Sequence, residues 1–328
     1  MSTLTYKAAY FNEFITDVND IKVGEVTAPV ELQPNQVRIE VRAASINPVD
    51  WKRAKGYVEA FFPTTFPSLI GYDVSGVVVA VGSEVTKFKV GDEIYGNLDA
   101  KTSTGSIAEY AVSNEDVLWH KPTSLSFAEA AGLGIAARTA HQALLRAEAG
   151  PGKSVFVNAG AGGVGNFVIQ FAKNLFKVEK IATTVSTNKV DLAKSLGAIE
   201  VVDYTKNDLI KVLKPEYDIA IDNLADIKPV DILKPKNTPR SKFITLVDPG
   251  LFEVHESKLK DLEIDHEFFI LNSSLKSFDG AINELLDAGK LQVPIDSTHK
   301  FTEQGVRNAL ARLADGHAAG KIIIIVKN

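Results

Sequence analysis

A glycine-rich turn near the middle of the chain carries the strongest chemical signal in the sequence. Gly160, Gly162 and Gly165 form a G-x-G-x-x-G pattern between the apolar run SVFVNA and the helix-like segment NFVIQFAK. In such a turn the first glycine permits a tight bend, the second lets the backbone approach a pyrophosphate, and the third lets helix and strand pack closely. The N-terminus of the helix favours the diphosphate. The pattern predicts a dinucleotide site that includes Gly163 and Val164, and a turn shaped for packing alone is the alternative.

The end of the next predicted strand indicates which dinucleotide binds. NAD-specific enzymes place Asp or Glu about 20 residues beyond the glycine turn, where it accepts a hydrogen bond from the ribose 2′-hydroxyl. Residues 180–189, KIATTVSTNK, contain no acidic side chain and offer the hydroxyl of Ser186 and the charge of Lys189. A missing carboxylate beside a cation fits a 2′-phosphate, so we expect NADPH as the cofactor. The alternative is that Lys189 is a solvated residue in the first turn of the next helix.

The elements that position these residues fall into two regions. The first third of the chain reads as short strands separated by turns, such as the alternating VRIEV. A helical stretch opens near Ser124, and beyond Gly152 strands alternate with helices, which is the pattern of a parallel sheet built from βαβ units. We therefore predict a β-rich domain over residues 1–123 and a doubly wound α/β domain over residues 124–298. The final strand, KIIIIV, could belong to either domain.

Composition excludes several classes of function. Of the 328 residues, 45% are hydrophobic and 23% are charged, which is the balance of a folded globular protein. The net charge of −5 gives no basic surface for nucleic acid. There is no cysteine, and the six histidines show no metal-ligand spacing, so we expect no metal site. No apolar stretch is long enough to cross a membrane and the start has no import signal, so we expect a cytoplasmic protein without a membrane partner.

Three segments match the motifs of a known family. Residues 71–82, GYDVSGVVVAVG, follow the G-H-E-x-x-G-x5-G pattern of alcohol dehydrogenases, residues 152–173 match the glycine turn of quinone oxidoreductases, and residues 317–326, HAAGKIIIIV, match a C-terminal strand. On these residues the chain resembles the medium-chain dehydrogenase/reductase superfamily, in its zinc-free quinone oxidoreductase (ζ-crystallin-like) branch. The resemblance implies a GroES-like partial β-barrel domain, completed by about residues 299–328, and a Rossmann domain with a doubly wound parallel sheet.

Departures from the zinc enzymes of that superfamily indicate the chemistry. Asn47 and Tyr72 stand where those enzymes hold zinc with Cys and His, so the resemblance implies hydride transfer without a metal. A quinone or an α,β-unsaturated ketone suits such a site, because the acceptor delocalises the incoming charge while donors stabilise the enolate oxygen. The expected protein is an NADPH-dependent quinone or enone reductase, commonly a homodimer in this family, with its natural acceptor left open. The alternatives are a non-catalytic NADPH-binding structural or sensing protein, and an enoyl-thioester reductase of lipid or polyketide biosynthesis.

The resemblance also assigns roles to residues of the first domain. Asn47 is the expected amide donor to the substrate, and Asp50 completes the family pattern N-x-x-D. Tyr57 and Tyr72 are expected to donate phenolic hydrogen bonds, and Lys52 is expected to contact the cofactor, whose phosphates a cation complements. The alternative for Asp50 is a structural acceptor in its own turn. For the two tyrosines it is a packing role with a satisfied hydroxyl.

In the second domain the resemblance places Thr139 near the nicotinamide. It places Lys189 and Tyr204 at the 2′-phosphate, with Ser186 beside them. The alternative for Tyr204 is an aromatic residue at a strand end, and for Thr139 a helix residue that bonds its own backbone. Further along, Ala225 stands where the family's D-x-x-G pattern has its glycine.

Overall fold

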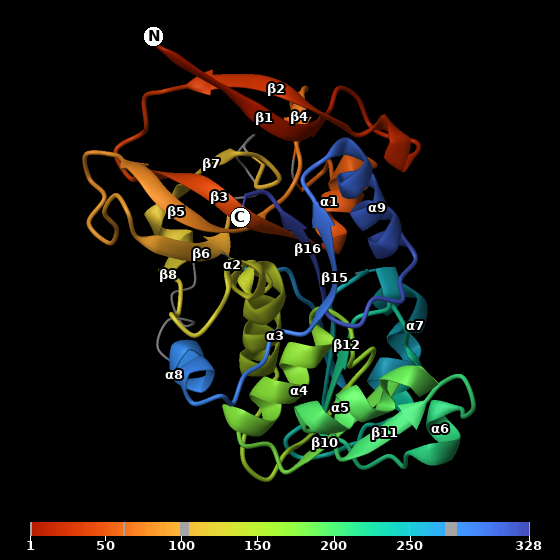
Figure 1. Cartoon of the computed structure of the whole chain (residues 1–328). Helices are drawn as coiled ribbons and strands as arrows, with labels where there is room; N and C mark the ends of the chain where they lie inside the picture. Colours follow the sequence, from red (N-terminus) through yellow and green to blue (C-terminus); the bar gives the residue numbers. More distant parts are fainter. Residues whose placement is uncertain (1, 62, 99–104, 249, 273–280, 328) are drawn as a thin grey trace. The chain divides into compact units, whose positions relative to one another are not determined.

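Two compact units make up the computed structural model, which describes residues 2–61, 63–98, 105–248, 250–272 and 281–327 (Figure 1). The first unit contains the described residues up to Ala136 and from Val293 onward. The second unit contains those from Ala137 to Asn272 and the segment 281–292.

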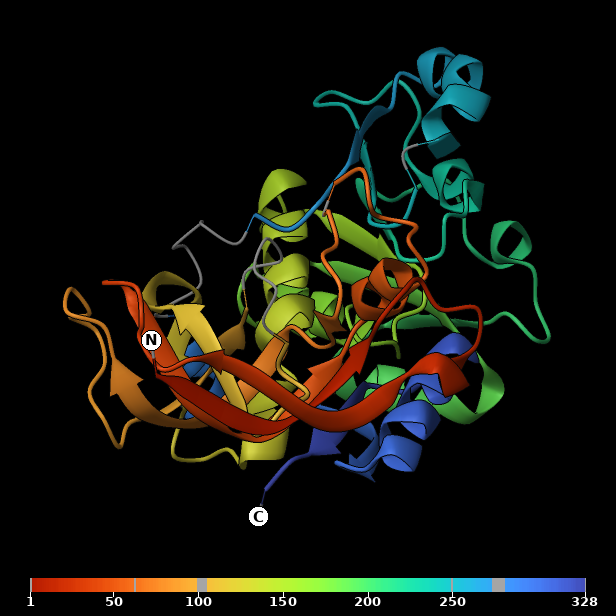
Figure 2. The same ribbon diagram turned by 90° about the horizontal axis from the view of Figure 1, so that it is seen from above.

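Strands that pair antiparallel, except for β15 beside β16, build the first unit. They are β1 (Thr3–Phe11), β2 (Lys22–Pro29), β3 (Gln36–Ile46), β4 (Ser68–Leu69), β5 (Asp73–Val81), β6 (Glu93–Asn97), β7 (Tyr110–Asn114), β8 (Leu118–His120), β15 (Ile295–Lys300) and β16 (Lys321–Ile325). One sheet has the order β2-β1-β4, and its red strands β1 and β2 run side by side in Figure 2. The other has the order β15-β16-β3-β5-β6-β8, with β7 paired to β3. The β-rich first domain predicted from the sequence is therefore confirmed.

The core of the first unit follows the predicted alternation along β3. Val37, Ile39 and Val41 are fully buried on one face of that strand. They pack against Val74 and Val78 of the neighbouring strand β5. Residues of one parity thus fill the core, as a half-buried strand requires.

Helix α2 (Phe127–Ala131) explains where the first unit ends. Ser126 caps the helix, because its hydroxyl oxygen accepts the N–H of Glu129 at 3.2 Å while its own N–H donates to the Glu129 carboxylate at 2.8 Å. The helix packs on β3 and β5, so the residues that follow Ser124 lie with the first unit up to Ala136. The predicted boundary, between residues 123 and 124, lies before the observed one at Ala136. A helical sequence pattern does not by itself show on which sheet the helix packs.

The C-terminal strand returns to the first unit. In β16, Ile322 lies opposite Ile46 and Ile325 opposite Ala43 in an antiparallel pair with β3. Strand β15 runs parallel to β16, and α9 (Glu303–Ala314) connects the two and buries its apolar face. The first unit therefore resumes at Val293, before the predicted position near residue 299.

A six-stranded, fully parallel sheet forms the second unit. Its strands are β9 (Ser154–Val157), β10 (Lys180–Val185), β11 (Glu200–Asp203), β12 (Ile219–Asp222), β13 (Lys242–Thr245) and β14 (Asp265–Phe268). Their order, β11-β10-β9-β12-β13-β14, is that of a Rossmann fold, which confirms the predicted doubly wound sheet. The helices are α3 (Gly134–Arg146, begun in the first unit), α4 (Gly165–Asn174), α5 (Val190–Leu196), α6 (Leu209–Val212), α7 (Gly250–Asp261) and α8 (Ala281–Asp287).

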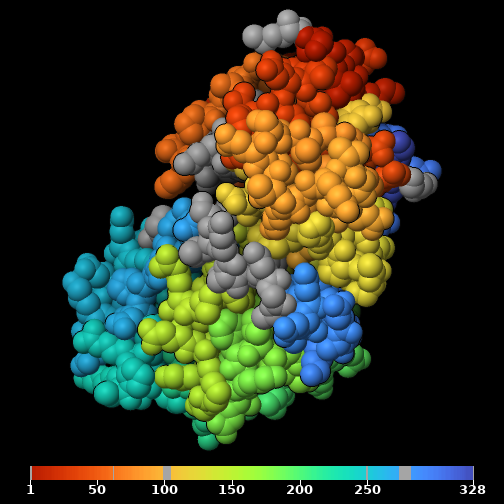
Figure 3. Space-filling view, turned by 90° about the vertical axis from the view of Figure 1, so that its left-hand side faces the viewer, coloured from red at the N-terminus to blue at the C-terminus, as the bar shows by residue number. Residues whose placement is uncertain are grey.

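The segment 281–292 is tied to helix α4 by side-chain amides. The Gln170 amide on α4 donates to the Gln292 carbonyl at 3.1 Å and accepts the Gln292 N–H at 2.8 Å. The Asn174 amide donates to the Lys290 carbonyl at 2.7 Å. Figure 3 shows the segment as a blue patch on the green surface of the second unit.

Candidate functional site

Helix α1 (Pro48–Ala54) begins at the segment NPVD and brings two predicted residues together. Pro48 occupies the first helical position, where a missing N–H costs no hydrogen bond. The backbone N–H of Asn47 donates to Asp50 Oδ2 at 2.7 Å, which is the contact expected for a structural acceptor. The Asp50 carboxyl is buried, and loss of hydration, helped by the nearby Asp73 carboxylate, raises its pKa to about 7.

A buried cluster of opposite charges holds the Asn47 side chain. The Asn47 amide nitrogen donates to Asp73 Oδ2 at 2.8 Å, and its oxygen accepts from Lys321 Nζ at 2.6 Å. Lys321 also lies 3.3 Å from Asp73 Oδ2. Loss of hydration raises the pKa of the Asp73 carboxyl, while contacts with Lys321, Asn47 and the Ile135 N–H oppose the rise. The sequence reasoning assigned no role to Asp73 or Lys321.

Tyr72 lies in the core of the first unit rather than on its surface. Its side chain packs with Val74 and Val78, and its hydroxyl oxygen accepts from Arg53 Nη1 at 2.5 Å. Tyr72 therefore has the buried ring and the hydrogen-bonded hydroxyl that are expected of a residue with a packing role.

Lys52 and Tyr57 lie at the other end of α1. The backbone N–H of Tyr57 donates to the carbonyl of Lys52 at 2.9 Å, so the two residues share one turn. The Tyr57 side chain is 72% exposed. Lys52 is half-buried.

The glycine turn between β9 and α4 has a specific geometry at each of its three glycines. A Cβ on Gly160 would lie 2.0 Å from Thr183 Oγ1, and one on Gly165 would lie 2.3 Å from the Ala159 carbonyl oxygen. Both positions therefore require glycine for close packing. At Gly162 a Cβ would make one tight contact, with the Ala159 carbonyl oxygen at 3.2 Å, and the rest of the space beside this residue is open.

The open side of the turn fits a diphosphate. The backbone at Gly162 can be approached closely, while the N–H groups of Asn166, Phe167 and Val168 donate to the carbonyls of Gly162 and Val164 and so hold the turn against the start of α4. The Asn166 amide donates to the carbonyls of Gly162 and Gly163, each at 2.8 Å, and thereby fixes the turn from its other side. The open side of this turn faces the positive end of the α4 dipole, which suits an anionic ligand.

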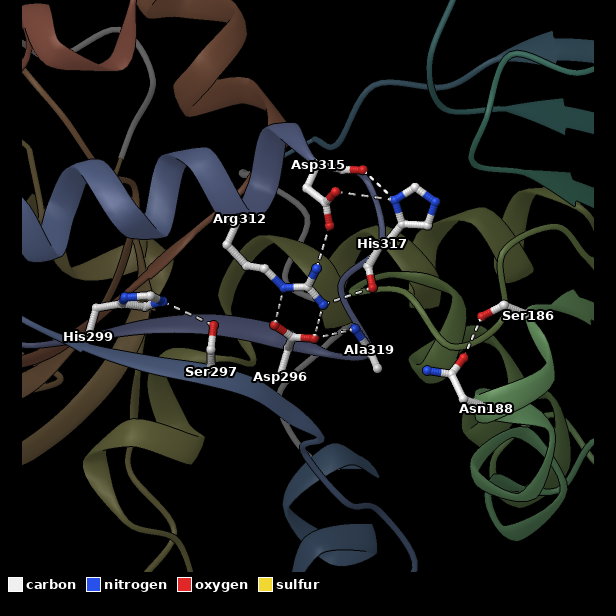
Figure 4. Close-up of polar contacts among 9 residues, drawn as sticks. All are labelled: Ser186, Asn188, Asp296, Ser297, His299, Arg312, Asp315, His317 and Ala319. Carbon is white, nitrogen blue, oxygen red and sulfur yellow. Dashed lines mark hydrogen bonds and ion pairs between the residues drawn. The ribbon is translucent and has the colours of Figure 1, made fainter.

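The residues predicted for the 2′-phosphate gather at the ends of β10 and β11. Ser186 follows β10, and its hydroxyl donates to Asn188 Oδ1 at 2.8 Å (Figure 4). Lys189 is half-buried at the start of α5, and Tyr204, which follows β11, is 52% exposed. The Tyr204 N–H donates to the Val185 carbonyl at 3.1 Å, which ties the two strand ends together.

A carboxylate that the sequence reasoning missed lies at the same place. Asp203 Oδ2 accepts from the Thr187 hydroxyl at 2.5 Å, and Asp203 Oδ1 accepts from the Thr205 hydroxyl at 2.6 Å. These two hydrogen bonds hold the pKa of Asp203 down at about 2, and Lys206 lies 3.4 Å away. The carboxylate thus fixes the turn after β10 and is itself occupied by hydroxyls from both sides.

A second ion-pair cluster supports the strand that carries Lys321. The Arg312 guanidinium on α9 donates to both carboxylate oxygens of Asp296 on β15, at 2.8 and 2.7 Å, and to Asp315 at 2.5 Å (Figure 4). Asp296 also accepts the Ala319 N–H at 2.7 Å, and its contacts with Arg312 lower its pKa to about 2. The cluster ties β15 and α9 to the loop that enters β16.

The remaining predictions concern Thr139, metal binding and the membrane. Thr139 is buried on α3. Within the described ranges, no three His, Cys, Asp or Glu side chains are grouped so that they could hold a metal ion. No helix in this part of the chain is long and apolar enough to span a membrane.

Known proteins resemble this chain along nearly its whole length. Residues 33–123 match the alcohol dehydrogenase GroES-like domain, and residues 196–324 match the zinc-binding dehydrogenase family. A 2-methylene-furan-3-one reductase of Solanum lycopersicum and a chloroplastic NADPH-dependent alkenal/one oxidoreductase of Arabidopsis thaliana are each 37% identical over 313 residues, covering 94% of this chain and 76% of each relative. The structure of the quinone oxidoreductase from Coxiella burnetii matches with a TM-score of 0.87 and 29% identity, covering 99% of this chain and 100% of that one.

A GroES-like domain joined to a Rossmann domain with a dinucleotide turn defines a class of oxidoreductases. The chain belongs to the medium-chain dehydrogenase/reductase superfamily, in its quinone oxidoreductase branch, as its motifs indicated.

Proposed function

We propose that this protein is an NADPH-dependent reductase that transfers hydride to a quinone or an α,β-unsaturated carbonyl compound without a metal. The observation that carries the proposal is the glycine turn, open at Gly162, beside a strand end that presents Ser186 and Lys189. Relatives named as an alkenal/one oxidoreductase and a 2-methylene-furan-3-one reductase support the acceptor class. Because the chain lacks cysteine and has Asn47 and Tyr72 at the family's zinc positions, the donor set for a catalytic zinc is missing.

The second unit would hold the cofactor, which supplies the hydride when bound. The backbone of the turn from Gly160 to Gly165 would take the diphosphate. Lys189 would pair with the 2′-phosphate, and the hydroxyls of Ser186 and Tyr204 would donate to it. Asp203 keeps the turn after β10 in place through Thr187, while its charge is balanced by hydrogen bonds and by Lys206.

The first unit would stabilise the charge that develops on the acceptor. The amide of Asn47 carries two hydrogens, of which one donates to Asp73, and we assign the other to the enolate or quinol oxygen. The Asp50 carboxyl, with its pKa raised to about 7, is an acid that can hold a proton at neutral pH. Water or this carboxyl would supply the proton that completes the reduction. We assign Tyr57, exposed at the far end of α1, to the substrate, and Lys52 and Thr139 to the nicotinamide side of the cofactor.

The test is an acceptor panel with each reduced nicotinamide. Purified protein is mixed with NADPH or NADH and with quinones, short enones and an enoyl thioester, and the absorbance of the reduced cofactor is followed. Consumption of NADPH with a quinone or enone, and little consumption of NADH, is the expected result. Turnover with the thioester alone would assign the protein to enoyl-thioester reduction. Tight NADPH binding without turnover of any acceptor would instead favour a structural or sensing role.

We also propose that the protein is a cytoplasmic homodimer. Strand β14 is the last of the six-stranded sheet, and its backbone edge could pair with that of a second copy. Light scattering on a sizing column should give twice the mass of one chain, and a fluorescent fusion should fill the cytoplasm. A monomeric mass or a signal confined to an organelle would contradict the respective proposal.

A further inference from the structure

Lys321 brings a positive charge into the interior of the first unit. Its side chain is 3% exposed, and it begins a strand that continues with four isoleucines. Burying an ion pair is costly, and replacing such a pair with apolar residues is often neutral or stabilising. A contribution to stability is therefore a poor explanation for burying the Lys321–Asp73 pair, which points to a functional one.

The contacts of the Lys321 ammonium define what it can do. It has three hydrogens and three acceptors, namely Asn47 Oδ1 at 2.6 Å, Asp73 Oδ2 at 3.3 Å and the Ile46 carbonyl at 3.4 Å. With its donors used in this way, the ammonium acts on its neighbours rather than on a substrate. Of these neighbours, only Asn47 has a side-chain donor to spare.

Lys321 and Asp73 together fix the orientation of the Asn47 amide. The ammonium lies against the amide oxygen and the carboxylate against the amide nitrogen. Turning the amide over would place the NH₂ group against the ammonium and the oxygen against the carboxylate, which creates two repulsive contacts. The second N–H of Asn47 therefore has one direction. The ammonium also polarises the amide, which makes that N–H a stronger donor.

Asp73 is itself held firmly by the backbone. Its Oδ1 accepts the N–H of Ile135 at 2.7 Å, at the start of α3. This approach depends on Gly134, since a Cβ there would lie 2.2 Å from Asp73 Oδ1. The carboxylate is thus a fixed reference point for both Lys321 and Asn47.

We propose that Lys321 is a positioning residue for the reduction, which orients and polarises Asn47 so that its second N–H meets the oxygen on which charge develops. This inference rests on the proposed function. It assigns to Lys321 an effect on kcat rather than on the affinity for NADPH, because Asn47, the group that Lys321 orients, is proposed to meet the acceptor oxygen and not the cofactor.

The experiment separates this role from a structural one by removing both charges together. The single variant Lys321→Met leaves Asp73 buried without its cation, so the double variant Lys321→Met/Asp73→Asn is the informative protein. The matched control is Lys121→Met, because the Lys121 side chain is also buried, at 6% exposure, and also has a carboxylate partner, Glu93 at 3.1 Å. Melting temperature, kcat and KM for NADPH are measured for each protein with the same acceptor.

We expect the double variant to melt close to the wild type and to keep its KM for NADPH, while kcat falls about tenfold to hundredfold. The control should keep its kcat, and Lys321→Arg, which retains a cationic donor, should exceed Lys321→Met in kcat. A folded double variant with wild-type kcat would overturn the inference and leave the proposed function standing. If the wild-type protein oxidises NADPH with none of the acceptors in the panel, the proposed function itself is overturned. This outcome is known before any variant is made.

Discussion

Replacing Asp50 with Asn should make the protein progressively more stable than the wild type as the pH rises. The Asp50 carboxyl is buried, and its pKa is raised from 3.8 to about 7. Between these two values the folded state holds a proton that the unfolded state releases, so the free energy of unfolding of the wild type falls with rising pH. Asn carries no charge and keeps an oxygen that can accept the Asn47 N–H.

The size of the effect follows from the two pKa values. A difference of one pKa unit between the folded and unfolded states corresponds to about 1.4 kcal/mol. Part of this titration lies below about pH 5, outside the range of the proposed measurement. Between pH 5 and pH 8 the variant should gain roughly 2–3 kcal/mol relative to the wild type. Urea unfolding followed by circular dichroism at the two pH values measures this change, and taking the difference between proteins removes the contribution of all unaltered groups.

Asp296→Asn is the matched control for this experiment. Asp296 is bound by Arg312 and its pKa is lowered to about 2, so it stays ionised in both states from pH 5 to pH 8. Its substitution should destabilise the protein by the same amount at both pH values. A pH-independent difference for Asp50→Asn would show that the Asp50 carboxylate is well solvated, and the reasoning from burial would then be refuted.

Four other substitutions test the second unit. Lys189→Ala should raise KM for NADPH about tenfold or more and leave KM for NADH unchanged, because it removes a charge-assisted contact to the 2′-phosphate; equal changes would contradict that role. Gly160→Ala should lower the melting temperature through its 2.0 Å approach to Thr183, whereas Gly162→Ala, whose Cβ approaches only the Ala159 oxygen at 3.2 Å, should lower it less and weaken NADPH binding in a fluorescence titration. Ala225→Gly should stabilise the protein against urea by up to about 1 kcal/mol, since Ala225 has φ of +57°; a loss of stability would contradict this account.

Local sequence patterns were sufficient for most of the fold. The alternation in VRIEV and the strand–turn–helix pattern around Gly160 depend on neighbours along the chain, and both elements lie where they were predicted. The boundary near Ser124 was placed too early because a five-residue helix carries the same composition whichever sheet it covers. Local patterns do not predict which distant residues meet in one site.

The two missed site residues differ in how they could have been found. Asp203 ends the strand that lies parallel to β10, and residues at the carboxyl ends of neighbouring parallel strands share one edge of the sheet. Once the strand order is assumed, Asp203 follows from the predicted strands. Lys321 is 248 residues from Asp73, and its position depends on the antiparallel register of β16 against β3, which a run of four isoleucines does not specify. The sequence does carry a chemical signal: a lysine that begins an apolar, mostly buried strand needs a buried partner, so its partner is to be sought among the unexplained carboxylates of the same domain.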